Sequence, residues 1–579
     1  MSHCHGIGEP SQAATAQAVR QGKSGALALA AAVTLTAALT TLYILYARFD
    51  TDELQHSHVT WEWTRGLVEY RDVFHNQAPL YHLLMAAPAA LAGERPDITI
   101  LMRLANIPFY LAALGATYLL SRRCFARGTA AWTAAIVAAV PTFLKYGTQF
   151  RPDVLWAALL VMTVCILTGA RLDWRRGLAA GLVAGVALCT SLKTPVALAA
   201  IVCAAGVLPL VRAKPRQTFP LRRAFAVAGA FGAGAVVAPA IMTAFFWRLG
   251  ALQSMVYCLF EHNAVAGIGR WEHPWQWLLA PVSAAVTIIL ARRTGRVAGD
   301  AGRDGRLQFV VLTAGFFATL LLFAPFVRPQ TVLPFVPLVA VPAVGLVAQG
   351  APLFRRRKNA AGAGGDRSNA KPPPWVAFGV VTLGLELTML IWPPWITNVP
   401  KYEAMISDVL ALTGQNDYVM DAKGESIFRH RPFYYALERL TTERLERGLM
   451  ADTIADRLIQ TRTCVVAGQL PRLPAKSRSF VRENYLKAGA LYVAGCLLRE
   501  NRSGDAGPIG FDVAIPAIYA VVSESTAANG RLDGAPYTGA VFLEAGRHEW
   551  ENDGPAGRLA VIWAQAAERG FTPAAFAGR

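Results

Sequence analysis

The sequence predicts a polytopic α-helical membrane protein that ends in a more polar α/β and β-rich region, and three observations support this fold class. Hydrophobic residues make up 54% of the 579 residues and charged residues 16%, with a mean hydropathy of +0.34. Apolar runs of roughly 20 residues, the length at which an α-helix crosses a bilayer, recur as far as residue 395. Beyond residue 396 the hydropathy falls.

The apolar runs predict about eleven membrane helices. We expect them at approximately 25–46, 99–120, 130–146, 153–170, 177–192, 194–211, 224–247, 274–291, 307–326, 331–349 and 375–395. Lys193 divides two of these helices. The apolar piece from Pro79 to Leu91 is too short to cross, so we expect it to lie at the interface or to re-enter the membrane.

Basic residues occur in every second loop, and this alternation predicts the orientation. Lys and Arg are retained on the cytoplasmic side of a membrane. The basic loops contain Arg122, Arg123, Arg127, Arg171, Arg175, Arg176, Arg212, Lys214, Arg216, Arg222, Arg223, Arg292, Arg293, Arg296, Arg303, Arg306 and Arg355 to Lys358. We therefore expect a cytoplasmic tail at 1–23 and a C-terminus on the outer side. The net charge of +18 then reflects topology and not nucleic-acid binding.

Acidic and imidazole side chains crowd the segment after the first span, "FDTDELQHSHVTWEWTRGLVEYRDVFHNQAPLYHLL" at 49–84. Asp52 and Glu53 stand at the outer mouth of that span, where simple solvation is the plain explanation. A second acid, Asp153, begins an apolar helix on the same predicted side of the membrane. Ionisable side chains in such positions are costly and often functional, so the separated acids predict a site.

Four short motifs resemble those of the C-type (GT-C) glycosyltransferases, in particular family 39, which includes protein O-mannosyltransferases and lipid A aminoarabinose transferases. The motifs are "DE" at 52–53, "PLY" at 79–81, "RPD" at 151–153 and "SLKTP" at 191–195. The resemblance covers about 24–350 and implies a catalytic membrane domain at 24–396. It also implies a bacterial inner membrane enzyme that moves a sugar from a polyprenyl phosphate carrier to an envelope lipid, glycan or protein at the periplasmic face.

The resemblance assigns roles residue by residue. It makes Asp52 the catalytic acidic residue, with Glu53 beside it and Asp153 as the second acid, and it implies inversion by a single displacement. A divalent metal (Mg, Mn or Zn) or cationic side chains would stabilise the leaving phosphate, with Asp52 and Asp153 as the metal ligands. Breaking a glycosyl phosphate bond requires activation of the acceptor and neutralisation of developing charge, whatever the family.

One departure affects the phosphate site. In "HNQAPLY", Asn76 and Gln77 stand where the aminoarabinose transferases carry an acidic residue and a lysine. These two amides and His75 can bind polar sugar or phosphate groups, but they supply no fixed positive charge. Phosphate neutralisation then falls to a metal or to cations elsewhere, and the candidates are Arg151, Lys193 and Arg328.

Two further elements carry candidates with alternatives left open. His56 is four residues after Asp52 and would share its helix face, whereas His58 would not; His56 is either a ligand or an interfacial hydrogen-bonding residue. In "FVRPQTVLPFVPL", Arg328 and Gln330 either contact phosphate, as the Pro-rich element of family 39 relatives suggests, or anchor the helix at the interface.

The polar end of the chain is predicted to contain an α/β domain at 397–500 and a small β-sandwich at 501–579, because short β runs there are broken by Asp-Gly and Ala-Gly turns. Cys464 and Cys496 either pair in an oxidising compartment or stay free. The loop "FEHNAVAG" at 260–267 either covers a cavity or is a surface loop.

Two other classes of function stay open. A secondary transporter would show internal repeats and ionisable residues near the membrane centre, whereas the acids here cluster on one predicted face. A non-catalytic envelope-binding protein would tolerate alanine at Asp52 and Asp153.

Overall fold

The computed structural model describes residues 12–169, 171–212, 220–267, 275–294, 301–324, 327–350, 372–498, 507–524, 528–553 and 557–576. The chain divides into two compact units. The first, the helical unit, comprises Met1–Ala47, Asn106–Thr243 and Gly267–Ile396. The second, the mixed unit, comprises Arg48–Ala105, Ala244–Ala266 and Thr397–Arg579.

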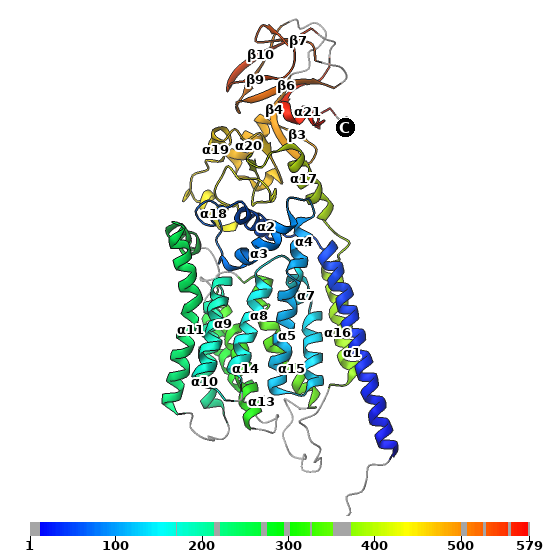
Figure 1. Ribbon diagram of the computed structural model, residues 1–579, viewed down its shortest axis with the longest axis vertical. Coiled ribbons are helices and arrows are strands. Elements are labelled where there is room, and N and C mark those ends of the chain that lie inside the picture. Colours follow the sequence, from blue (N-terminus) through cyan, green and yellow to red (C-terminus); the bar gives the residue numbers. More distant parts are fainter. Residues whose placement is uncertain are drawn as a thin grey trace, which may run out of the picture. The chain divides into compact units, whose positions relative to one another are not determined.

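Long helices lie side by side in the helical unit (Figure 1). They are α1 (Gln12–Tyr46), α5 (Ile107–Cys124), α6 (Arg127–Ala139), α7 (Pro141–Thr148), α8 (Asp153–Leu167), α9 (Trp174–Thr190), α10 (Thr194–Val211), α11 (Leu221–Arg248, whose last turn belongs to the mixed unit), α13 (Trp275–Thr294), α14 (Ala301–Leu321), η2 (Pro329–Val332), α15 (Phe335–Ala348) and α16 (Pro374–Ile391). Each of the eleven predicted spans coincides with one or two of these helices.

Seven helices among the described residues are long and apolar enough to cross a membrane. The pair α7 and α8, bent by 119°, makes an eighth if it counts as one span. Helices α6, α9 and α15 coincide with predicted spans but are only 13, 17 and 14 residues long. The predicted polytopic helical membrane fold is confirmed.

Close backbone packing joins α9 to α11, and the cause is a glycine every fourth residue. A Cβ atom on Gly181 would lie 2.1 Å from the carbonyl oxygen of Phe231, and one on Gly177 or Gly185 would come within 2.7 Å of other backbone oxygens of α11. Small residues at this spacing let membrane helices approach closely, because lipid provides little hydrophobic force to press helices together.

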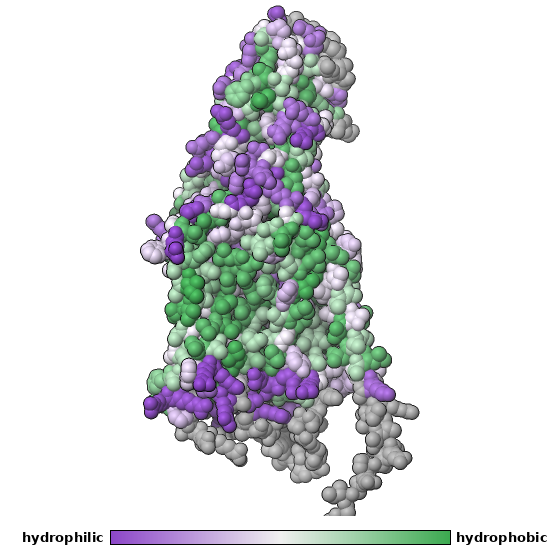
Figure 2. Space-filling view, viewed as in Figure 1, coloured by the Kyte–Doolittle hydropathy of each residue, from purple (hydrophilic) through white to green (hydrophobic). Residues whose placement is uncertain are grey.

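Hydrogen bonds join the basic loops of the helical unit to one another. Arg306 donates from Nη1 to the carbonyl oxygen of Arg123 at 3.0 Å, and Arg223 donates from Nε to that of Leu172 at 2.8 Å. The joined loops therefore lie at the same end of the unit. Figure 2 shows apolar side chains along the sides of these helices and a hydrophilic band at one end. Which side of the membrane this end faces stays a prediction.

The mixed unit combines helices with two sheets. Its helices are α2 (Thr51–Thr64), α3 (Leu80–Ala92), α4 (Ile98–Ala105), α12 (Leu252–Val256), the π-helix η1 (Tyr257–Glu261), α17 (Val399–Leu412), α18 (Arg439–Glu446), α19 (Ile454–Gln460), η4 (Leu470–Arg472), α20 (Ala475–Asn484) and α21 (Ala564–Glu568). The apolar piece at Pro79–Leu91 forms α3, which at 13 residues is too short to cross.

The strands of the mixed unit are β1 (Val419–Met420), β2 (Val465–Val466), β3 (Tyr485–Ala488), β4 (Leu491–Leu498), β5 (Ile509–Val513), β6 (Ala517–Ser523), β7 (Gly530–Leu532), β8 (Ala535–Pro536), β9 (Val541–Leu543), β10 (Gly546–Asn552) and β11 (Leu559–Trp563). A seven-stranded sheet has the order β1-β2-β4-β11-β6-β9, with β3 also paired to β4. A four-stranded sheet has the order β5-β10-β7-β8. Among the strand pairs of the described residues, β1–β2 is parallel and the others are antiparallel.

Both sheets contribute to one apolar core, which includes Val466, Val521, Trp550 and Val561. The predicted β-rich C-terminal region is confirmed. The larger sheet runs across residue 500, because β4 pairs with β11 in the register Cys496 opposite Val561. The division of the chain into a tail at 1–23 and domains at 24–396, 397–500 and 501–579 stays a prediction.

Cys464 and Cys496 are both free in the structure. Burial raises the pKa of Cys464 to about 12 and that of Cys496 to about 11. Both thiols are therefore protonated and unreactive at neutral pH, as buried structural cysteines are.

Candidate active site

Asp50, Asp52 and Glu53 at the start of α2 have three different environments, and Asp50 caps the helix. Asp50 is the N-cap, where its carboxylate accepts a hydrogen bond from the backbone N–H of Asp52 at 3.0 Å. Glu53 accepts from the N–H of Asp50 at 3.1 Å, which completes a capping box. The spacing of Asp50 and Glu53 therefore starts the helix, and Asp52 projects from its first turn.

Glu53 is fully buried and paired with Arg103 of α4. Nε and Nη2 of the guanidinium each donate to one carboxylate oxygen at 2.6 Å. A buried bidentate pair of this kind holds two elements together, because either partner alone would be an uncompensated buried charge. The second acid of the "DE" motif thus links α2 to α4.

Asp52 differs from its neighbour because its side chain is 25% exposed. Its carboxylate forms an ion pair with the ammonium of Lys423, a residue 371 positions further along the chain. An ionised carboxylate with access to solvent and a cation beside it can accept a proton from a bound hydroxyl group. Lys423 was missed by the sequence analysis.

Two buried acids, each paired with an arginine, hold the loop that carries Lys423. Asp421 accepts from Arg431 at 3.0 Å and from the backbone N–H of Ser426 at 2.8 Å, and Glu425 pairs with Arg472. The pKa of Asp421 is lowered, because Arg431 and the Ser426 hydrogen bonds outweigh the effect of burial. Lys423 lies between these two anchored acids, so its position is set by the loop.

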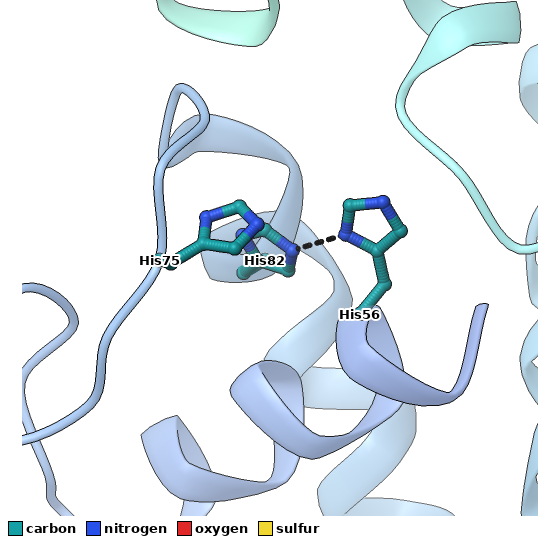
Figure 3. Close-up of side chains that lie close together, drawn as sticks. All are labelled: His56, His75 and His82. Atoms are coloured by element: carbon teal, nitrogen blue, oxygen red, sulfur yellow. Dashed lines mark hydrogen bonds between the residues drawn. The ribbon is translucent and has the colours of Figure 1, made fainter. Parts of the chain in front are cut away.

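Three histidines of the mixed unit lie together: His56 on α2, His75 in the following loop and His82 on α3 (Figure 3). All three are buried. Nδ1 of His56 is 2.9 Å from Nε2 of His82. Glu69, also buried, accepts from Nδ1 of His75 at 2.7 Å and lies 3.3 Å from Nδ1 of His82. We call these four residues the histidine cluster.

The charge state of the histidine cluster follows from its contacts. Burial disfavours the ionised form of Glu69, but the two histidines outweigh it and lower the pKa of Glu69 to about 2. Burial also lowers the pKa of His75, so its imidazole is neutral. Among the described residues, His56, His75 and His82 are the one group of three potential ligands whose ligand atoms lie within 4.8 Å of one another.

His58 faces away from this cluster, as its spacing predicts. Its Nδ1 is 2.8 Å from the carbonyl oxygen of Ile427, and its Nε2 is 3.5 Å from Glu62. His56 and His58 therefore lie on different faces of α2, and the preference for His56 as a site residue stays a prediction.

Asn76 and Gln77 take part in loop contacts, Asn76 through its side-chain amide and its carbonyl oxygen and Gln77 through its carbonyl oxygen. Asn76 donates from Nδ2 to Oδ1 of Asn263 at 3.1 Å, and Nδ2 of Asn263 donates to the carbonyl oxygen of Asn76 at 3.0 Å. The carbonyl oxygen of Gln77 accepts from the hydroxyl of Tyr70 at 2.6 Å. These bonds tie the loop at 260–267 to the segment before the "PLY" motif.

The helical unit contains a second acidic centre, built by two of the predicted cations. Asp153 is the first residue of α8 and is buried. It accepts from Nε of Arg151 at 3.1 Å and from Nζ of Lys193 at 2.9 Å. Arg151 is buried, whereas the Lys193 side chain is 37% exposed. Two cations around one carboxylate leave a net charge of about +1 at this centre.

Arg328 and Gln330 lie at η2 of the helical unit. Arg328 is exposed and Gln330 is half-buried. This placement agrees with either alternative for Arg328, a phosphate contact or an interfacial anchor.

The prediction that Asp52 and Asp153 bind a metal stays a prediction. Asp52 is paired with Lys423, and Asp153 is paired with Arg151 and Lys193. These cations supply the charge compensation that a metal would otherwise bring.

Comparison with known proteins relates this arrangement to a family. Residues 76–247 match the family described as dolichyl-phosphate-mannose-protein mannosyltransferase. The matched segment contains the "PLY", "RPD" and "SLKTP" motifs, and "DE" precedes it. None of the proteins of curated function matches the chain by sequence.

Two solved structures of ArnT from Cupriavidus metallidurans share the fold. The complex with undecaprenyl phosphate aligns at 14% identity with a TM-score of 0.54, covering 80% of this chain and 97% of ArnT. The apo structure aligns at 14% identity with a TM-score of 0.52, covering 83% and 98%. The chain has the fold of a C-type glycosyltransferase. The resemblance that the four motifs indicate is thus confirmed, and the C-type fold accounts for a helical membrane region followed by a sheet-containing C-terminal region.

Proposed function

We propose that this chain is a membrane glycosyltransferase that moves a sugar from a polyprenyl phosphate carrier to an envelope lipid, glycan or protein. We place the reaction at the periplasmic face of a bacterial inner membrane, with the N-terminus cytoplasmic and the C-terminus periplasmic. The ArnT structure that holds undecaprenyl phosphate supports the carrier, and the family named for dolichyl phosphate mannose supports a lipid-linked donor. The basic loops support the orientation.

The observation that carries the proposal is the contrast between Asp52 and Glu53. Glu53 is buried and both of its oxygens are bound by Arg103. Asp52 is partly exposed and lies beside one ammonium group. Of the two acids in the "DE" motif, only Asp52 has the access to reach an acceptor hydroxyl, so we assign Asp52 as the general base and Glu53 as a residue that positions α2.

The proposed reaction is a single displacement at the anomeric carbon. The acceptor oxygen forms a bond to that carbon while the bond from the carbon to the phosphate oxygen breaks. The proton of the acceptor hydroxyl passes to the Asp52 carboxylate, and the carrier phosphate leaves with the bonding electron pair. Attack opposite the leaving group inverts the anomeric configuration.

The leaving phosphate requires cations, and we assign this task to the Asp153 centre. Arg151 and Lys193 exceed the charge of Asp153 by about one unit. Arg151 is fixed by burial, while Lys193 is exposed enough to meet a ligand. Arg328, exposed at η2, is a further phosphate candidate. His75, Asn76 and Gln77 remain proposed contacts to the polar substrate, as does Gln330.

The test is transfer of labelled sugar by the purified full chain in lipid, using a panel of polyprenyl phosphate donors that carry different hexoses and pentoses. We expect one donor to be consumed and Asp52→Asn to lower the rate by about 10²- to 10⁴-fold, the usual contribution of a positioned base. Asp72→Asn is the matched control, because Asp72 is similarly exposed and pairs with Arg71 at 2.8 Å. That control should keep the wild-type rate.

The outcomes separate the alternatives. If Asp52→Asn remains folded and keeps the wild-type rate, the assignment of the base is wrong although the transferase stands. If no donor in the panel is consumed and a non-hydrolysable donor analogue does not bind, the transferase proposal fails, and transport or envelope binding takes its place.

A further inference from the structure

We propose that His56, His75 and His82 form a binding site for a zinc-like divalent transition metal ion, with Glu69 as the acceptor that orients two of the rings. The metal ligands implied by the family resemblance are Asp52 and Asp153, so this site is a different one. It does not depend on the proposed sugar transfer.

Three separate segments of the chain bring their histidines to one place. His56 comes from α2, His75 from the loop before the "PLY" motif and His82 from α3, and their rings face one another (Figure 3). One nitrogen of each ring lies within 4.8 Å of one nitrogen of the other two. Tetrahedral zinc with Zn–N bonds of about 2.0–2.1 Å places its nitrogen ligands roughly 3.3 Å apart. To reach that spacing, nitrogens that lie 4.8 Å apart must approach each other by about 1.5 Å.

Glu69 favours a proton on the Nδ1 atoms of His75 and His82. Its carboxylate accepts from Nδ1 of His75 and lies against Nδ1 of His82. A proton on each Nδ1 leaves the lone pair of each ring on Nε2. Metal-binding histidines almost always donate their other N–H to a carboxylate, a carbonyl or water, which orients the ring and raises its basicity. Glu69 provides this contact for His75 through a hydrogen bond and lies 3.3 Å from the corresponding nitrogen of His82.

One buried nitrogen of the cluster, Nε2 of His75, lacks a hydrogen-bond partner among the described residues. An unsatisfied buried polar group costs free energy. A plain hydrogen-bonding network of the three rings leaves this atom unexplained, whereas a metal ion bound at Nε2 accounts for it.

The ligand type selects the class of ion. Imidazole nitrogen suits zinc, copper, iron and nickel, whereas magnesium, calcium and manganese prefer carboxylate and carbonyl oxygen. Three protein ligands are also the usual number at a catalytic zinc site, which keeps a fourth position open. Because His56 lies one helical turn after Asp52, an ion here would join α3 and the His75 loop to the helix that carries Asp52.

The experiment measures metal content in the purified full chain. The protein is stripped with a chelator, reloaded with Zn²⁺, freed of excess by dialysis and analysed by mass spectrometry. We expect about one zinc ion per wild-type chain. A Co²⁺-loaded sample should show the visible absorption of cobalt in a low-symmetry nitrogen site. His82→Gln should lose both signals.

Two further variants keep the test decisive if His82→Gln folds poorly. Glu69→Gln retains all three ligands and should weaken zinc binding by about 10- to 100-fold. His548→Ala removes a histidine of β10 that lies outside the cluster and pairs with Asp533, and it should bind zinc like the wild type.

The N-terminal tail needs its own control, because it contains His3, Cys4 and His5. Replacing these three residues together should leave the bound zinc in place. The inference is overturned if the wild type holds no zinc, if the tail substitution removes it, or if a folded His82→Gln protein binds zinc as tightly as the wild type.

Discussion

The interactions inside the helical unit differ from those inside the mixed unit. In the helical unit, α9 and α11 pack through glycines, and buried charges are confined to the Asp153 centre among the ion pairs of its described residues. In the mixed unit, buried acids join segments far apart in the chain, as Glu53 joins Arg103 and Glu425 joins Arg472. The difference follows from the surroundings, because backbone fit can hold helices together in lipid whereas polar groups removed from water require partners.

This contrast separates residues that support the fold from residues available for chemistry. A buried pair with both oxygens bound has little capacity left for a substrate. Asp52 and Lys193 are the partly exposed members of their ion pairs, at 25% and 37%. Asp52 is followed in the chain by Glu53, which is buried and paired with Arg103. Lys193 is bonded to Asp153, which is buried and also paired with Arg151. The exposed members are therefore the ones we expect to meet the substrate.

The largest effect should come from breaking the buried pair of the mixed unit. Glu53→Gln leaves the Arg103 guanidinium buried without a counter-charge, which typically costs about 3–5 kcal/mol. Amide hydrogen exchange in 48–105 should therefore accelerate by about 10²- to 10⁴-fold, while exchange in α13 and α14 of the helical unit should stay unchanged.

A double substitution sharpens this test. Replacing both partners with apolar residues of similar size, as in Glu53→Leu with Arg103→Met, removes the uncompensated charge and should restore most of the protection. If the double variant is as unprotected as Glu53→Gln, the pair acts through something other than charge compensation. If Glu53→Gln alone leaves the exchange rates unchanged, the ion pair does not stabilise this region, and Glu53 becomes a second candidate for the catalytic role that we give to Asp52.

The helical unit was largely predictable from the sequence because its elements are local. Hydropathy alone places a helix at each of the eleven predicted spans, and the structure brings together Arg151, Asp153 and Lys193 of the "RPD" and "SLKTP" motifs. Their role in catalysis stays a prediction. These residues lie at helix starts, where a break in an apolar run marks them. A charged residue at the start of an apolar run is easily recognised in the sequence.

The mixed unit was less predictable, because its contacts join residues far apart in the chain. Asp52 was identified from its motif, but Lys423 and Arg103 were not, since no local pattern pairs them with α2. His82 was visible in the acid-rich segment, yet only the fold places it against His56. The one local signal that was overlooked is the Asp50–Glu53 capping box, which already assigns Glu53 to the helix start.

A smaller effect should follow from separating α9 and α11. Gly181→Ala places a methyl group against the Phe231 carbonyl, so the helices must move apart, and overpacking of this kind costs about 1–3 kcal/mol. Gly232→Ala is the matched control, because a Cβ there meets nothing within 4 Å. Thermal inactivation in detergent should be faster for Gly181→Ala and unchanged for Gly232→Ala. Equal rates for both variants would show that close packing contributes nothing measurable.

The smallest effect should be at Lys193, and it tests whether the exposed members of the ion pairs meet the substrate. Lys193→Gln leaves Asp153 paired with Arg151, so the fold should persist. Negative charge grows on the phosphate as it leaves, and one lost hydrogen bond to that charge is worth about 1.5 kcal/mol, so kcat should fall roughly tenfold with the KM for the donor changed less. Lys145→Gln is the control, because the Lys145 ammonium lies over the Trp392 ring at 4.3 Å. A rise in KM with an unchanged kcat would instead show that Lys193 helps to bind the donor without stabilising the departing phosphate.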